Sequence, residues 1–124
     1  MKASGLFKLL AGILVVAALV ATVVHQQRQT RLADPRLYTG DKTIVMLATS
    51  WCGYCKRLRA GLDAAGVKYR VLDVEDGGEG EKAYHAVGGR GVPVTVIGQD
   101  VVHGYNAPKL TSLLKSLGHE VKLN

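Results

Sequence analysis

The sequence predicts an α/β domain with a four-stranded mixed sheet in the order β-α-β-α-β-β-α, flanked by helices and preceded by an N-terminal hydrophobic helix. An apolar strand pattern at 42–48 leads into the only two cysteines, and a helical pattern follows them. A second strand pattern, 67–74, comes after that helix, so a right-handed crossover makes the first two strands parallel. Two further strand patterns, 93–97 and 101–103, flank a Gly-Gln-Asp turn typical of an antiparallel hairpin.

The N-terminus contains a long hydrophobic segment. Residues 9–24 form an apolar run of about 16 residues, against the roughly 20 that span a bilayer. If Lys8 snorkels to the interface, the run extends, and we expect residues 6–24 to lie in the membrane. Residues 1–25 are either a signal anchor or a cleaved signal peptide. The run is longer than a typical signal core, which favours the anchor.

The basic residues that flank this segment bear on its orientation. Lys2 and Lys8 lie before it, and Arg28 and Arg31 lie after it, so the charges nearly balance. We expect the N-terminus inside the cytoplasm and the domain outside it, which in a bacterium is the periplasmic side.

The rest of the chain divides into three parts. Residues 26–41 are polar and contain the breaker Asp34-Pro35, which predicts a linker. Residues 42–118 hold all the strand and helix patterns of the domain. Residues 119–124 form a tail without an informative pattern.

The net charge of +6 does not indicate a nucleic-acid-binding protein. Four of the 16 basic residues and none of the 10 acidic ones lie in residues 1–33, which leaves 12 basic against 10 acidic in the remainder. The remainder also has no basic stripe with interleaved aromatic residues, so we expect no nucleic-acid partner.

Three segments of the domain have the pattern of a helix. The first helix, 54–65, has an apolar face made of Cys55, Leu58, Leu62 and Ala65, and Gly66 suits its C-terminal cap. An acidic, Gly-rich turn at 75–80 precedes a short helix at 81–87. The last helix has Asn106 as its N-cap, Pro108 in its first turn and a leucine stripe that ends at Gly118.

The strand, Cys-x-x-Cys and helix together indicate a redox site. A helix that begins at Cys52 directs unsatisfied N–H groups and its positive dipole end at the sulfur, and both favour the nucleophilic thiolate. Cys55 lies one turn later on the same face, close enough to resolve a mixed disulfide. A zinc site, a static disulfide and two unrelated buried cysteines are alternatives. A structural zinc site needs about four ligands, so we expect no metal there.

Three separated motifs resemble the glutaredoxin family of the thioredoxin superfamily over residues 42–117. Cys52-Gly53-Tyr54-Cys55 is similar to the family's Cys-Pro-Tyr-Cys, and Gly91-Val92-Pro93 is similar to its Thr-Val-Pro or Gly-Val-Pro. His103-Gly104-Tyr105-Asn106 stands where the family often has Gly-Gly-x-Asp.

The resemblance implies a thioredoxin-like fold, a cis Val92-Pro93 bond and thiol–disulfide oxidoreductase activity. It implies Cys52 and Cys55 as catalytic residues. The residues that it implies for glutathione or substrate binding are Tyr54, Val92, Pro93, Gly104, Tyr105 and Asn106. Arg90 precedes the Val-Pro corner, where it could meet a carboxylate of the substrate. Without the resemblance, Pro93 is an ordinary strand-start proline, Asn106 a helix cap and Arg90 a solvated loop cation.

The chain departs from the family pattern at four places, one of which is His103 in place of the first Gly of the Gly-Gly pair. Thr49 stands where the family often has a Lys or Arg that binds the glycyl carboxylate of glutathione. The segment 104–108 also resembles the Gly-Phe-x-Pro corner of redoxins reduced by thioredoxin reductase. Gly53 replaces the usual Pro, and family members with a small residue there can bridge a [2Fe-2S] cluster between two monomers.

The first functional hypothesis is therefore a membrane-tethered oxidoreductase that reduces protein disulfides or glutathione mixed disulfides. Its electron donor is glutathione, as co-substrate, or a reductase. The alternatives are a [2Fe-2S]-bridged homodimer and an extracytoplasmic thiol oxidant or isomerase that uses the same cysteines.

Overall fold

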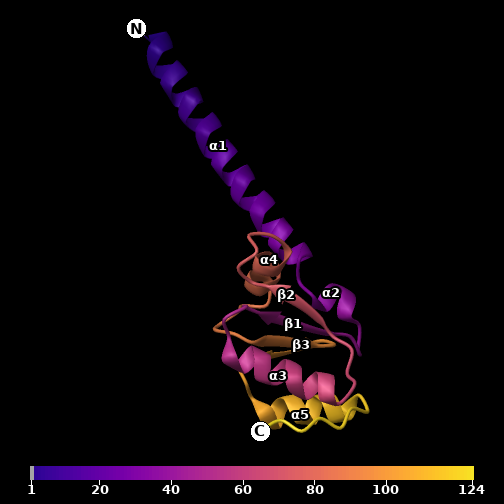
Figure 1. Ribbon diagram of the computed structural model, residues 1–124. Helices are drawn as coiled ribbons and strands as arrows, with labels where there is room; N and C mark the ends of the chain where they lie inside the picture. Colours follow the sequence, from indigo (N-terminus) through magenta and orange to yellow (C-terminus); the bar gives the residue numbers. More distant parts are fainter. Residues whose placement is uncertain (1) are drawn as a thin grey trace.

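The computed structural model describes residues 2–124 (Figure 1). The helices and strands in chain order are α1 (Lys2–Leu32), α2 (Arg36–Thr39), β1 (Ile44–Ala48), α3 (Gly53–Ala64), β2 (Arg70–Asp73), α4 (Glu79–Ala86), β3 (Val94–Ile97), β4 (Asp100–His103) and α5 (Ala107–Ser116). The predicted order of strands and helices within the domain is confirmed, and the short helix α2 is an additional element ahead of the sheet.

The sheet has the strand order β2-β1-β3-β4. Strands β1 and β2 are parallel, with Met46 opposite Val71, while β3 is antiparallel to both β1 and β4. The predicted mixed sheet and its hairpin are therefore confirmed. Strand β2 is shorter than the predicted 67–74, because the Val67 N–H donates to the Leu62 carbonyl at the end of α3 rather than to a strand.

The central strand β1 is buried on both faces, which explains its unbroken apolar sequence. Ile44, Met46 and Ala48 pack into the core layer that contains α3 and α5. Val45 and Leu47 pack into the opposite layer, together with residues of α4. Figure 1 shows the same arrangement, with α3 and α5 on one face of the sheet and α4 on the other.

Helix α1 extends beyond the predicted membrane segment. It continues to Leu32, so the predicted linker 26–41 is in large part helical. The physical reason is local: Gln, Arg and Leu favour helix, and no Gly or Pro interrupts the segment before Asp34-Pro35. Its best 18-residue window has a mean hydropathy of 2.5 and is not buried. Helix α1 is therefore long and apolar enough to cross a membrane, as an anchor or as a signal sequence.

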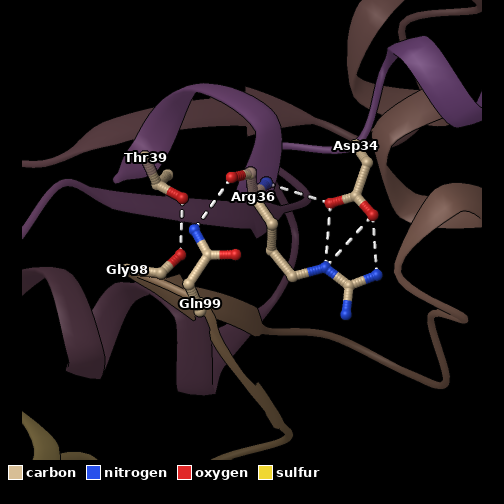
Figure 2. Close-up of polar contacts among 5 residues, drawn as sticks. All are labelled: Asp34, Arg36, Thr39, Gly98 and Gln99. Carbon is tan, nitrogen blue, oxygen red and sulfur yellow. Dashed lines mark hydrogen bonds and ion pairs between the residues drawn. The ribbon is translucent and has the colours of Figure 1, made fainter. Parts of the chain in front are cut away.

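Residues 34–39, which follow α1, make polar contacts with one another and with the domain (Figure 2). The Arg36 guanidinium donates to both oxygens of Asp34, the closest contact being 2.6 Å. The buried Thr39 hydroxyl donates to the Gly98 carbonyl, and Gln99 donates to the carbonyl of Arg36 at 2.9 Å. These bonds hold α2 against the hairpin between β3 and β4.

A second contact joins α1 itself to the domain, since Lys82 of α4 donates to Gln29 at 3.3 Å. The predicted linker 26–41 thus contains helical segments that make polar contacts with the domain.

The C-terminal tail is also structured. The His119 N–H donates to the Leu114 carbonyl at 2.9 Å, and the chain then turns back along the domain. Val121 is 4% exposed and belongs to the core, and Leu123 packs against the same cluster. No local pattern in residues 119–124 predicts this packing.

Candidate active site

The two cysteines lie at the N-terminus of α3, where the sequence predicts them. Cys52 is the N-cap residue, with extended backbone angles, and its sulfur accepts a hydrogen bond of 3.0 Å from the Cys55 N–H. The helix begins at Gly53, one residue earlier than predicted. Cys52 and Cys55 form a disulfide, with Cα atoms 5.2 Å apart. In the reduced protein the same N–H group and the helix dipole would stabilise a thiolate on Cys52.

The Val92-Pro93 peptide bond is cis, as the resemblance implies. Pro93 is buried directly before β3, and its carbonyl accepts a 2.8 Å hydrogen bond from the Gly104 N–H. Gly104 has a φ of 75°, in the left-handed region that favours glycine, so the chain can turn there from β4 towards α5.

A groove of about 740 Å³ lies between the start of α3 and the start of α5; we call it the aromatic groove. Its lining residues are Tyr54, Arg57, Val92, His103, Gly104, Tyr105, Asn106, Ala107, Pro108 and Asn124. The rings of Tyr54 and Tyr105 stack with centroids 5.4 Å apart. The Arg57 guanidinium lies 5.5 Å from the first ring centroid and 5.9 Å from the second, within cation–π range.

Two polar groups of this groove have well-defined surroundings. The Asn106 side chain caps α5 by accepting a 3.1 Å hydrogen bond from the Lys109 N–H. The Tyr105 hydroxyl is buried and has no hydrogen-bond partner among residues 2–124. The groove therefore combines aromatic faces and a cation, which suits a polar or anionic peptide.

A smaller hollow of about 280 Å³ is also lined by Val92; we call it the acidic hollow. Its lining residues are Thr49, Trp51, Val74, Glu75, Glu81, Tyr84, His85, Gly91 and Val92. The Trp51 indole donates to Glu75 at 2.6 Å, and the Tyr84 hydroxyl donates to the Gly91 carbonyl at 3.0 Å. His85 Nε2 lies 3.9 Å from a carboxylate oxygen of Glu81.

The structure gathers most, but not all, of the residues named from the sequence. Five of them line the aromatic groove: Tyr54, Val92, Gly104, Tyr105 and Asn106. Pro93 is buried behind Val92, and the exposed Arg90 lines neither the aromatic groove nor the acidic hollow. Within residues 2–124, no three His, Cys, Asp or Glu side chains gather as a metal site would require.

Other lining residues had no binding role in the sequence interpretation. Arg57 follows Tyr54 by three positions on a helix, so its place beside that ring was available from helical spacing. Glu75 and Asn124 reach the site through tertiary folding, and no local pattern marks them.

Comparisons with known proteins agree with this geometry. A family model described as glutaredoxin matches residues 43–102. No curated protein sequence matches the chain. A solved glutaredoxin from Archaeoglobus fulgidus is 35% identical, and the match covers 64% of this chain and 94% of that one, with a TM-score of 0.53.

More distant structures share the fold. Buckwheat glutaredoxin, solved as a complex with glutathione, is 23% identical over 73% of this chain and 94% of its own, with a TM-score of 0.58. The glutaredoxin-like NrdH-redoxin of Escherichia coli, described as having a thioredoxin-like activity profile, is 21% identical over 57% of this chain and 93% of its own, with a TM-score of 0.51. The sheet topology, the cysteine pair at a helix N-terminus and these matches agree: the chain belongs to the glutaredoxin family.

Proposed function

We propose that this protein is a membrane-anchored thiol–disulfide oxidoreductase that reduces protein disulfides or glutathione mixed disulfides. The observation that carries the proposal is the Cys52–Cys55 disulfide at the start of α3, whose sequence neighbours line the aromatic groove and the acidic hollow. Trp51 lines one of these cavities and Tyr54 lines the other, so a ligand in either one is close to the cysteine pair.

The catalytic cycle starts from the dithiol form. The Cys52 thiolate attacks one sulfur of the substrate disulfide, a new S–S bond forms, and the other substrate sulfur leaves as a thiolate that takes up a proton. The Cys55 thiolate then attacks the Cys52 sulfur, which forms the intramolecular disulfide and releases the second substrate thiol. The substrate gains two electrons, and the cysteine pair loses them. Two glutathione molecules, or a reductase, then return the disulfide to the dithiol.

The aromatic groove supports a glutathione-type substrate. Its cation, Arg57, and its stacked tyrosine rings suit a small anionic peptide. Val92 lies directly before β3 and lines both cavities, so an extended peptide could pair with its backbone beside Cys52.

Helix α1 supports the membrane attachment. Residues 9–24 of α1 are apolar on all sides of the helix and exposed, and such a segment is stable in lipid rather than in water. We propose that it anchors the chain with the domain on the periplasmic side. A single cysteine introduced at exposed Lys115, in a Cys52→Ser/Cys55→Ser background, tests on which side of the membrane the domain lies. In intact cells, a thiol reagent that does not cross the inner membrane should label it. Labelling only after lysis would contradict it.

Cysteine variants test the proposed chemistry. Cys52→Ser should abolish turnover of every disulfide substrate, because the attacking sulfur is lost. Cys55→Ser should retain reduction of glutathione mixed disulfides, in which a second glutathione can release the product, and should lose reduction of protein disulfides. Ser50→Ala, at an exposed neighbouring position, is the control and should keep full activity.

The two alternatives give different results in the same preparations. A protein with a [2Fe-2S] cluster held by Cys52 of two copies would be brown after anaerobic reconstitution and colourless as Cys52→Ser. An oxidant or isomerase would have a redox potential well above that of a reductant. Either result, or turnover by Cys52→Ser, would overturn the proposed function.

A further inference from the structure

The C-terminal tail, residues 119–124, forms part of the aromatic groove. The tail runs back beside α5 after that helix ends, and its last residue lies near the first turn of α5 (Figure 1). Asn124 lines the groove together with Tyr54, Arg57 and Asn106. A segment that follows the last helix of the domain thus reaches the cavity beside the cysteine pair.

The tail is held in this position by apolar packing. Val121 is buried in the core layer of α3 and α5, and Leu123 packs against that layer. Leu123 lies over Gly61 of α3, where a Cβ atom would come within 2.5 Å of the leucine Cδ2 and 3.5 Å of the Lys122 carbonyl oxygen. A glycine in a helix interior is unfavourable for the helix. Here it leaves space for the tail.

The Asn124 side chain is available for a ligand. It is exposed, and within residues 2–124 no hydrogen bond occupies its amide. Asn106 differs, because its side-chain oxygen already accepts a hydrogen bond from the Lys109 N–H as the cap of α5. Asn124 therefore offers the groove a free amide with both donor and acceptor capacity.

We propose that Asn124 contacts the substrate in the aromatic groove, where its amide hydrogen-bonds the polar end of a glutathione-type peptide, and that Val121 and Leu123 position it. This inference rests on the proposed function, since it assigns a residue to the same binding groove. The tail is then part of the substrate site rather than an appendage of the fold.

Steady-state kinetics of the full chain in detergent test the proposal, with a peptide–glutathione mixed disulfide as substrate. Asn124→Ala should raise KM by about threefold to tenfold and leave kcat unchanged, as expected for the loss of one hydrogen bond. Leu123→Ala should raise KM in the same way, because it loosens the segment that positions Asn124. Lys122→Ala, at the exposed tail residue that precedes Leu123, should match the parent protein. Unchanged KM in both Asn124→Ala and Leu123→Ala would overturn the proposal.

A binding measurement separates failure of this inference from failure of the proposed function. We would titrate the nitrogen-15-labelled full chain with S-methylglutathione, whose blocked thiol cannot exchange. Shifts of the side-chain amide signals of both Asn106 and Asn124 support the inference. A shift at Asn106 without one at Asn124 contradicts the inference and leaves the proposed function intact. No shift at either residue contradicts both the inference and a glutathione-type substrate.

Discussion

The two cavities beside the cysteine pair differ in charge. The aromatic groove contains Arg57 and His103 and, among the described residues that line it, no carboxylate side chain. The acidic hollow contains Glu75 and Glu81 and, among its described lining residues, no Lys or Arg. Val92 lines both. A ligand in either cavity therefore meets the same cysteine pair. The aromatic groove favours anionic ligand groups, whereas the acidic hollow favours cationic ones.

This difference bears on how a peptide would lie across the site. An anionic group is favoured near Arg57, and a neutral or cationic group is favoured near Glu75 and Glu81. Thr49, at the place where many family members have a cation, lines the acidic hollow and adds no positive charge. These charges favour ligands held mainly by the aromatic groove, with the acidic hollow selecting the residues that flank a substrate disulfide.

Reversing the charge in the aromatic groove should have the largest effect on substrate recognition. We expect Arg57→Glu to lower kcat/KM for a peptide–glutathione mixed disulfide by about tenfold or more, the usual cost of losing a hydrogen bond to a charged partner. Repulsion between the new carboxylate and the substrate adds to that loss. Arg59→Glu, on the same helix and also exposed, makes the same change in net charge away from the groove and should have little effect. Equal losses in the two variants would show that only net charge matters.

Neutralising the acidic hollow should have a smaller and opposite effect. We expect Glu75→Gln/Glu81→Gln to reduce the preference for a disulfide peptide flanked by lysine over one flanked by aspartate by about twofold to fivefold, as surface charges are screened by water and salt. Gln at position 75 keeps an acceptor for the Trp51 indole. The ratio of kcat/KM for the two peptides, measured at low and high salt, gives the result. A ratio that does not change on mutation would remove the acidic hollow from substrate selection.

The sequence predicts the position of the two cysteines better than it predicts the charge of the cavities beside them. Helical spacing and an unbroken apolar run place Cys52 and Cys55 at the start of a helix that follows a buried strand, because these are local properties of the chain. The charge of the acidic hollow depends on Glu75, which reaches Trp51 from 24 residues away. Only the packing of the loop before α4 brings the two side chains together.

Local patterns also do not predict the structure at the two ends of the domain. The tail alternates apolar Val121 and Leu123 with polar neighbours, but six residues are too few to establish a periodic pattern. At the other end, the bond between Gln99 and the Arg36 carbonyl joins residues 63 positions apart. Contacts of this kind depend on the assembled sheet, so the predicted linker and tail gave no sign that they would be structured.

The smallest predicted effect concerns Asp76, which supports the helix behind the acidic hollow. Its carboxylate accepts hydrogen bonds from the N–H groups of Gly78 at 2.7 Å, Gly80 at 3.0 Å and Glu81 at 3.2 Å, at the start of α4. The bond from Gly78, followed by that from Gly80, holds the pKa of Asp76 below its usual value of 3.8. A lowered pKa in the folded state stabilises the fold above the unfolded value, and this contribution is lost as the pH falls through the folded value.

Asp76→Ala should therefore lower the unfolding midpoint slightly at pH 7 and leave it unchanged at a pH well below 3.8, where the carboxyl of the parent protein is protonated. Thermal unfolding of both proteins in detergent, followed by circular dichroism from pH 7 down to pH 2, measures this difference. Asp100→Asn, at an exposed carboxylate on β4, is the matched control and should show no such convergence. If α4 frays, Glu75 and Glu81 are no longer held in the acidic hollow. Asp76→Ala should therefore also weaken the preference for a disulfide peptide flanked by lysine over one flanked by aspartate. If the midpoint falls and the preference remains, the loop supports the fold without positioning Glu75 and Glu81 for recognition.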